Sequence, residues 1–314
     1  MTVDDGSAPE LACSLGAMLG EGPVWCAASQ SLWFVDIKGL AVHRFDAASR
    51  ALQSWTAPSQ SGWVLPMVGG RLLAGLQAGL HAFDPATGRF EALAAPEADR
   101  PGNRLNDACV DGAGRVWFGS MHDAEAAASG RVYLLDDGQI SVCAIPPVTI
   151  TNGPAVSPDG RTLYFVDTLA GRLDAYEIAA DGGLSNRRVF AQISPADGHP
   201  DGHPDGHPDG HPDGPTVDSE GCVWIGLFGG WGVRRYSAQG ELLEQRRFPV
   251  ANVTKIAFGG PDLCTAYATT ARLGLSAEQC AQQPLAGDLF SFRVAVPGLA
   301  TTLVPASALR ARLA

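Results

Sequence analysis

The sequence predicts an all-β protein, a single six-bladed β-propeller with four-stranded blades that fills residues 1–314. Three observations lead to this fold: many turn-forming residues, short β-rich cores that recur along the chain, and nearly equal spacing between those cores. Glycine and proline number 38 and 22 among the 314 residues. Because this content is well above average usage, it disfavours a helical bundle or a coiled coil.

Six short segments carry the repeat, and each mixes aromatic and aliphatic residues over the length of one strand. Most of them follow a turn signal such as DGAG, SPDG or DSEG. Their central residues lie 40, 44, 47, 60 and 43 positions apart, and a period of about 40–50 residues with several strands per unit is typical of propeller blades. The segments are SLWFVD (31–36), RLLAGL (71–76), RVWFGS (115–120), TLYFVD (162–167), CVWIGL (222–227) and TAYATT (265–270).

The one long interval contains a low-complexity tract at 197–212, in which the unit DGHP occurs four times. Without three of these copies the interval is 48 residues, so we interpret 197–212 as a repeat loop inside the single domain. A competing interpretation is a transition-metal site made by the four histidines of the tract. Proline and glycine in every unit exclude the helix that would align them, which favours a mobile surface loop. The histidines are His199, His203, His207 and His211.

The stretch Ala12–Ala17 precedes the first repeat, and we expect it to pair into the sixth blade, because ring closure removes exposed sheet edges.

The net charge of −11 argues against a nucleic-acid partner, whose phosphates require a cationic surface. No apolar run is long enough to span a membrane, and the acidic N-terminus MTVDDGSAPE does not have the pattern of a signal peptide. We therefore expect a cytoplasmic protein. Its seven scattered cysteines include no CxxC pair, which disfavours a disulfide framework or a zinc knuckle.

Polar side chains recur near the start of four predicted innermost strands, 11 or 12 residues before the aromatic centre of the next core. The innermost strands of a propeller line its channel and begin at one mouth. We therefore expect these side chains to meet around the channel axis. They are Glu21, Asn106, Asn152 and Asp213.

Glu21, Asn152 and Asp213 offer oxygen donors with a summed charge of −2, a set that suits a hard divalent cation. Without a cation the two carboxylates would repel each other. Arg104 lies two residues before Asn106, on the same face of an extended strand. A guanidinium beside an amide can hold the hydroxyl and carbonyl oxygens of a small polar ligand. Each EG, NG or DG dipeptide alone is more typical of a turn, so the shared spacing is what favours a site.

Five stretches resemble the SMP-30/gluconolactonase/regucalcin-like family, in order and in register from about residue 15 to 285. Within that family the sequence looks most like bacterial sugar lactonases, including xylonolactonase. The stretches are LGEGPVW, NRLNDACVDGAGRVWFGSMHD, ITNGPAVSPDGRTLYFVDT, PDGPTVDSEGCVWIG and NVTKIAFGGPD.

The resemblance implies a six-bladed propeller that holds one divalent metal and hydrolyses a small-molecule sugar lactone, such as xylonolactone or gluconolactone, to the aldonic acid. It also implies that the metal ligands are Glu21, Asn152 and Asp213. By the same resemblance, Arg104 and Asn106 contact the substrate, and a further acidic contact falls near Asp123 or Glu125. The DGHP tract departs from the family, in which a single PDG stands. We assign Asp213 because it alone keeps the 11-residue spacing to the next aromatic centre.

For the chemistry, we hypothesise that the cation polarises the lactone carbonyl and lowers the pKa of a water, while Asp213 acts as the catalytic base. Ca²⁺, Zn²⁺, Mg²⁺, Mn²⁺ and Fe²⁺ all accept such ligands. One alternative is a metal-dependent esterase or phosphotriesterase on the same propeller. Another is a non-catalytic binding propeller, although the repeated GH…WD signature of one such class is absent. A serine hydrolase is disfavoured because no GxSxG motif occurs.

Overall fold

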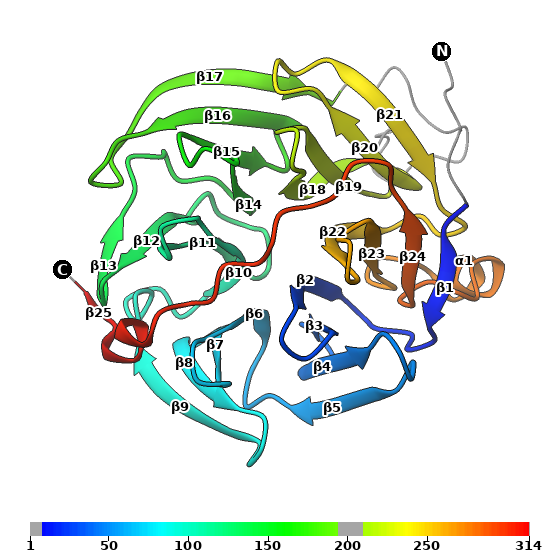
Figure 1. Ribbon diagram of the computed structural model, residues 1–314, viewed down its shortest axis with the longest axis horizontal. Helices are drawn as coiled ribbons and strands as arrows, with labels where there is room; N and C mark the ends of the chain where they lie inside the picture. Colours follow the sequence, from blue (N-terminus) through cyan, green and yellow to red (C-terminus); the bar gives the residue numbers. More distant parts are fainter. Residues whose placement is uncertain (1–7, 194–209, 314) are drawn as a thin grey trace.

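The computed structural model describes residues 8–193 and 210–313. Six sheets stand around one channel, and the four main strands of each are antiparallel (Figure 1). The chain forms the blades one after another, except that its first strand joins the last blade and its last strand joins the third. Each sheet runs from an innermost strand at the channel to an outermost strand at the rim, and every predicted core forms the second strand. The predicted six-bladed propeller with four-stranded blades is confirmed.

The first three blades come from the N-terminal half of the chain. Blade 1 contains β2 (Gly20–Cys26), β3 (Ser31–Asp36), β4 (Ala41–Asp46) and β5 (Leu52–Thr56). Blade 2 contains β6 (Ser61–Pro66), β7 (Leu72–Leu76), β8 (Gly79–Asp84) and β9 (Arg89–Ala94). Blade 3 contains β10 (Asn103–Val110), β11 (Val116–His122), β12 (Val132–Asp136) and β13 (Gln139–Val142), with the short β25 (Arg312–Leu313) added at its rim.

The other three blades complete the ring. Blade 4 contains β14 (Thr151–Val156), β15 (Thr162–Asp167), β16 (Arg172–Ile178) and β17 (Leu184–Gln192). Blade 5 contains β18 (His211–Val217), β19 (Val223–Phe228), β20 (Gly232–Tyr236) and β21 (Leu242–Arg247). Blade 6 contains β22 (Val253–Gly259), β23 (Thr265–Thr270), β24 (Leu289–Arg293) and, at its rim, β1 (Glu10–Cys13).

The N-terminal strand closes the ring as expected, since β1 pairs antiparallel with β24. The paired strand ends at Cys13, so it begins and ends earlier than the stretch Ala12–Ala17 that was expected to pair. Most of the DGHP tract lies outside the described residues. Its last two residues, His211 and Pro212, belong to β18.

Aromatic residues fill the spaces between blades, because each blade packs face to face against two neighbours. All six residues of β3 are buried, which explains why its sequence is a continuous apolar run rather than an alternating one. Trp25 of blade 1 stacks on Tyr267 of blade 6 with ring centroids 5.8 Å apart. The ring centroids of Trp63 in blade 2 and Phe118 in blade 3 lie 6.0 Å apart. The core of this fold is therefore a ring of blade interfaces around the channel.

After β24, residues 294–305 cross the face of the propeller, as the red segment of Figure 1 shows. On the way this segment forms bridges to Asp218 in blade 5 and Met67 in blade 2. The 3₁₀ helix η2 (Ala306–Arg310) follows and leads into β25. Residues 299–302 line a cavity with the later residues of the innermost strands, so the crossing segment covers the end of the channel where those strands finish.

The other helix, α1 (Ala277–Gln282), follows β23 and begins with a capping box at Ser276. Within the described ranges, neither helical element has the length and apolar content needed to cross a bilayer. All seven cysteines lie in those ranges and are free thiols.

Candidate active site

All five predicted site residues line a single cavity of about 450 Å³ at the mouth where the innermost strands begin. They come from four blades, and every one of them is buried. The structure therefore brings together side chains that are separated by up to 192 positions in the sequence. The residues are Glu21 on β2, Arg104 and Asn106 on β10, Asn152 on β14, and Asp213 on β18.

Glu21, Asn106, Asn152 and Asp213 occupy equivalent places in their blades. Each lies three positions before the residue that pairs with the aromatic centre of its hairpin. The spacing is 11 residues rather than 12 in blades 3 and 5 because the paired residues there are one position closer in sequence. The pairs are Val24 with Trp33, Cys109 with Trp117, Ala155 with Tyr164, and Thr216 with Trp224.

A shift in strand register lies at each of these places and turns the side chain toward the channel. In β2 and β14 the shift follows Glu21 and Asn152 directly. The next residues, Gly22 and Gly153, have φ angles of 56° and 76°, which glycine adopts without strain. The EG and NG dipeptides therefore belong to β-bulges that aim a side chain at the channel. They are not ordinary hairpin turns.

Glu21 and Asp213 bring two carboxyl groups into contact, close enough for a hydrogen bond between them. Burial, followed by the charge of Asp107, raises the pKa of Glu21 to about 7. Burial and the neighbouring Glu21 raise the pKa of Asp213 well above its ordinary value. In both groups burial is the largest cause and a neighbouring carboxylate adds to it, so the ionised forms of the pair are disfavoured without a further positive partner.

A chain of hydrogen bonds links the remaining predicted residues across blades 3 and 4. Arg104 Nη1 donates to Asn106 Oδ1 at 2.6 Å, which confirms that these two side chains share one face of β10. Asn106 Nδ2 donates in turn to Asn152 Oδ1 at 2.9 Å. Asn152 Nδ2 donates to the hydroxyl of Thr168, also at 2.9 Å. These bonds fix the orientations of both amides. Asn152 turns its oxygen toward Asn106 and its nitrogen toward Thr168.

Asp123 joins three blades at the edge of the cavity. It is one of the two acidic residues, with Glu125, that the family resemblance offered as a further substrate contact. Its carboxylate accepts hydrogen bonds from Lys38 Nζ at 2.6 Å and from Arg104 Nε at 2.9 Å. Gln60 Nε2 donates to its second oxygen at 2.9 Å. The hydrogen bonds and the two cations outweigh partial burial and lower the pKa of Asp123 to about 2. Asp123 therefore holds the Arg104 guanidinium in place. Both Asp123 and Glu125 line the cavity.

An ion pair that was not predicted from the sequence lies one position deeper in the channel, between Asp107 and Lys255. Lys255 Nζ lies 2.6 Å from Asp107 Oδ1, and both side chains are buried. The second oxygen of Asp107 accepts the N–H of Gly153 at 2.8 Å, so the pair also supports the bulge that carries Asn152. Asp107 lies 10 residues before Trp117 and Lys255 lies 12 residues before Tyr267, so a count that covered the sixth blade and one further position would have reached both residues.

The three predicted metal ligands offer oxygen atoms from two carboxyl groups and one amide. Among the residues that the structure describes, no three His, Cys, Asp or Glu side chains gather as a metal-binding group. His211 lines the cavity, whereas His199, His203 and His207 lie outside the described residues. The carboxylates that compete with Asp213 within the tract lie there too: Asp197, Asp201, Asp205 and Asp209.

Two curated relatives are similar to this chain over nearly its whole length. A 6-deoxy-6-sulfogluconolactonase of Pseudomonas putida is 32% identical over 287 residues, which cover 91% of this chain and 95% of that protein. An L-arabinolactonase of Azospirillum brasilense is 34% identical over 288 residues, with 90% and 91% covered. Both names are those of lactone-hydrolysing enzymes.

A solved structure shows the same architecture. The crystal structure of a calcium-binding protein, regucalcin, from Agrobacterium tumefaciens superimposes with a TM-score of 0.87 at 28% identity, and the match covers 95% of this chain and 97% of that chain. Residues 19–272 match the family described as the SMP-30/gluconolactonase/LRE-like region. The matched residues include all five predicted site residues, and the chain belongs to this family.

Proposed function

We propose that this chain hydrolyses a sugar lactone, such as xylonolactone or gluconolactone, to the aldonic acid, with one divalent cation held in the cavity. The observation that carries the proposal is the buried pair of carboxyl groups, Glu21 and Asp213, beside an arginine and two amides in one cavity. The relatives named L-arabinolactonase and 6-deoxy-6-sulfogluconolactonase support this class of substrate.

The donor set fits a hard divalent cation. Two buried carboxylates in contact repel each other, and a cation between them offsets both their repulsion and the cost of their burial. Asn152 Oδ1 accepts one hydrogen bond from Asn106, and a carbonyl oxygen has a second lone pair to offer. Ligands that are all oxygen suit Ca²⁺ or Mg²⁺ better than a thiophilic metal. The description of the similar regucalcin as a calcium-binding protein agrees with this choice.

The size and lining of the cavity suit a small sugar lactone. Its volume of about 450 Å³ falls within the range of pockets that enclose small molecules. Apolar side chains share the lining with the polar groups described above, and they can pack against the carbon faces of a sugar ring. They are Leu19, Met121, Ile150, Phe228 and Leu273.

Arg104 orients the substrate in this proposal. Its Nε atom donates to Asp123, and its Nη1 atom donates to Asn106 and to the carbonyl oxygen of Leu105. These bonds fix the guanidinium plane, and the Nη2 amino group then remains for the hydroxyl oxygens of the sugar. The lactone carbonyl is thereby directed toward the two carboxyl groups.

Asp213 acts as the base. A carboxylate oxygen of Asp213 accepts a proton from the water that attacks the carbonyl carbon. As the ring carbon–oxygen bond breaks, the proton passes to the ring oxygen, which becomes a hydroxyl group of the aldonic acid. When bound, the cation supplies Lewis-acid polarisation of the carbonyl and lowers the pKa of a water.

A pH-stat assay tests the function, because lactone hydrolysis releases acid. Xylonolactone and gluconolactone are compared with aryl esters and an organophosphate, before and after EDTA treatment and after return of each divalent cation. We expect acid release from at least one lactone, loss with EDTA and recovery with a cation. Full activity in the metal-stripped protein would rule out the role of the cation. A clear preference for aryl esters or organophosphates would favour the esterase or phosphotriesterase alternative.

A further inference from the structure

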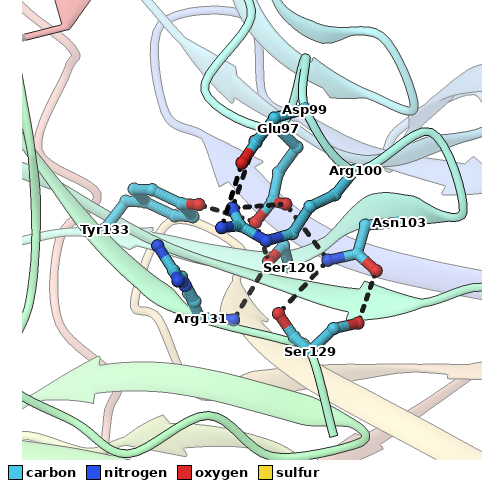
Figure 2. Close-up of polar contacts among 8 residues, drawn as sticks. All are labelled: Glu97, Asp99, Arg100, Asn103, Ser120, Ser129, Arg131 and Tyr133. Atoms are coloured by element: carbon cyan, nitrogen blue, oxygen red, sulfur yellow. Dashed lines mark hydrogen bonds and ion pairs between the residues drawn. The ribbon is translucent and has the colours of Figure 1, made fainter. Parts of the chain in front are cut away.

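Another buried carboxylate lies outside the cavity, in the segment 95–102 between β9 and β10. Glu97 is 5% exposed, and four side chains converge on it, as Figure 2 shows. Its Oε1 atom accepts the hydroxyls of Ser120 at 2.5 Å and Tyr133 at 2.6 Å. Its Oε2 atom accepts from Asn103 Nδ2 at 3.1 Å and from Arg100 Nη1 at 3.5 Å. Glu97 thus contacts three separate segments of blade 3 from the loop that precedes it.

The bonds continue from Glu97 into the loop 123–131, which connects β11 to β12. Asn103 Oδ1 accepts the hydroxyl of Ser129 at 2.6 Å, and Asn103 Nδ2 also points at the Ser129 carbonyl at 3.3 Å (Figure 2). At the start of the same loop, the N–H of Asp123 donates to the carbonyl of Gly102 at 2.9 Å. Both ends of the loop 123–131 are therefore attached to the chain around Asn103.

Asn103 and Arg104 are neighbours at the start of β10, and successive residues of a strand point to opposite faces. Arg104 faces the cavity, whereas Asn103 faces Glu97. Asp123, the ion-pair partner of Arg104, begins the loop 123–131. Arg104 and Asp123, which form the ion pair at the edge of the cavity, are thus both attached to the chain around Asn103, and Asn103 is bonded to Glu97. Glu97 itself is not among the residues that line the cavity.

We propose that Glu97 is a positioning residue of the lactone site, which acts through Asn103 on Arg104 and on the loop 123–131. This role rests on the proposed function. Bonds to an ionised acceptor are stronger and more directional than neutral ones, which suits a carboxylate that must hold several donors in one arrangement. Burial and the hydrogen bond to Glu97 raise the pKa of Tyr133, so Tyr133 stays a donor at physiological pH.

The role predicts a change in substrate binding rather than in the chemical step. If Arg104 and Asp123 lose their support, the guanidinium samples more orientations and the sugar binds less tightly. The carboxyl groups of Glu21 and Asp213 stand on other blades and keep their arrangement. We therefore expect Asn103→Ala to raise KM about five- to tenfold, the effect of one lost hydrogen bond, with kcat within about twofold of wild type.

The test compares Asn103→Ala with a matched control, Arg115→Met. Arg115 forms a buried ion pair with Asp111 at the opposite end of blade 3, so the control also loses a buried polar contact of this blade. Hydrogen exchange followed by mass spectrometry is measured without substrate. We expect exchange in residues 122–131 to accelerate about five- to tenfold in Asn103→Ala and to stay at the wild-type rate in Arg115→Met. KM is then measured for both variants and for Glu97→Ala.

The two readouts separate this proposal from the proposed function. Failure of the wild-type protein to hydrolyse any lactone overturns the function and, with it, the effect on KM, while the exchange rates still report whether Asn103 holds the loop. Unchanged exchange in residues 122–131 of Asn103→Ala overturns the positioning role, and so does an equal rise of KM in Arg115→Met. Should Glu97→Ala not fold, Asn103→Ala alone decides the question.

Discussion

Buried carboxylates occur at both ends of the channel, and their surroundings differ. At the end covered by residues 294–305, Asp218 is saturated: Oδ1 accepts the N–H groups of Glu220 and Cys222, and Oδ2 accepts Trp224 Nε1 and Arg235 Nε. Asp111 repeats this arrangement in blade 3, with donors at the same offsets of two, four and six residues.

At the other end, Glu21 and Asp213 face each other. Glu21 accepts the N–H of Gly22, but burial and the charge of Asp107 outweigh this bond and the nearby cations, and its pKa is raised to about 7. The comparison separates two uses of one residue type. A buried acid with a full set of protein donors stabilises the fold, whereas a buried pair of acids in contact is stable only with a partner that the chain does not supply.

The largest effect is expected for Asp213→Asn, which removes one charge of the unbalanced pair. Loss of the base and of a cation ligand should lower kcat/KM by about 10³-fold or more. The same change should raise the melting temperature of the cation-free protein, because it removes the repulsion with Glu21. Both quantities are measured on one preparation by the pH-stat assay and by calorimetry in EDTA. Turnover near the wild-type rate would remove Asp213 from the mechanism.

The opposite result is expected for Asp218→Asn. The new amide group would point a donor at the donors of Trp224 and Arg235, and the free energy of unfolding should fall by about 3 kcal/mol. Since Asp218 is remote from the cavity, kcat/KM should stay within about twofold of wild type. Urea unfolding and the lactone assay check the two parts. An increase in the free energy of unfolding of Asp218→Asn would contradict the structural role assigned to Asp218.

A smaller effect is expected for Arg104→Ala, which leaves both carboxyl groups in place. Loss of charged hydrogen bonds to the sugar should raise KM about 10- to 100-fold with little change in kcat. Initial rates over a range of lactone concentrations separate the two constants. A fall in kcat at unchanged KM would mean that Arg104 acts in the transition state rather than in binding.

The smallest effect concerns Asp123, whose pKa the native contacts lower to about 2. A carboxyl group with a lowered native pKa contributes stability above its unfolded pKa of about 4, and that stability is lost as pH falls toward 2. The wild-type protein should therefore be more stable than Asp123→Asn at pH 7, and the difference should shrink below about pH 4. Urea titrations at several pH values give this difference. A constant difference from pH 7 to pH 3 would show that the Asp123 charge does not contribute.

The repeat spacing was enough to predict the blades and four of the cavity residues, because blade symmetry places equivalent residues on one rim. Arg104 followed from strand alternation, two residues before Asn106. Asp107 and Lys255 were missed, since they pair across the channel and only their meeting makes them notable. Glu97 lies in a connection outside the repeated cores, where no periodicity applies. The Asp123 contacts depend on loop lengths in three blades, and neither a motif nor a count from the aromatic centres encodes those lengths.

Isothermal titration of the metal-stripped protein with Ca²⁺ and Mg²⁺ tests the central claim most directly. We expect one cation to bind per chain in the wild-type protein and in Asp218→Asn, and binding to be lost in Asp213→Asn. Absence of binding by the wild-type protein, or unchanged binding in Asp213→Asn, would contradict it.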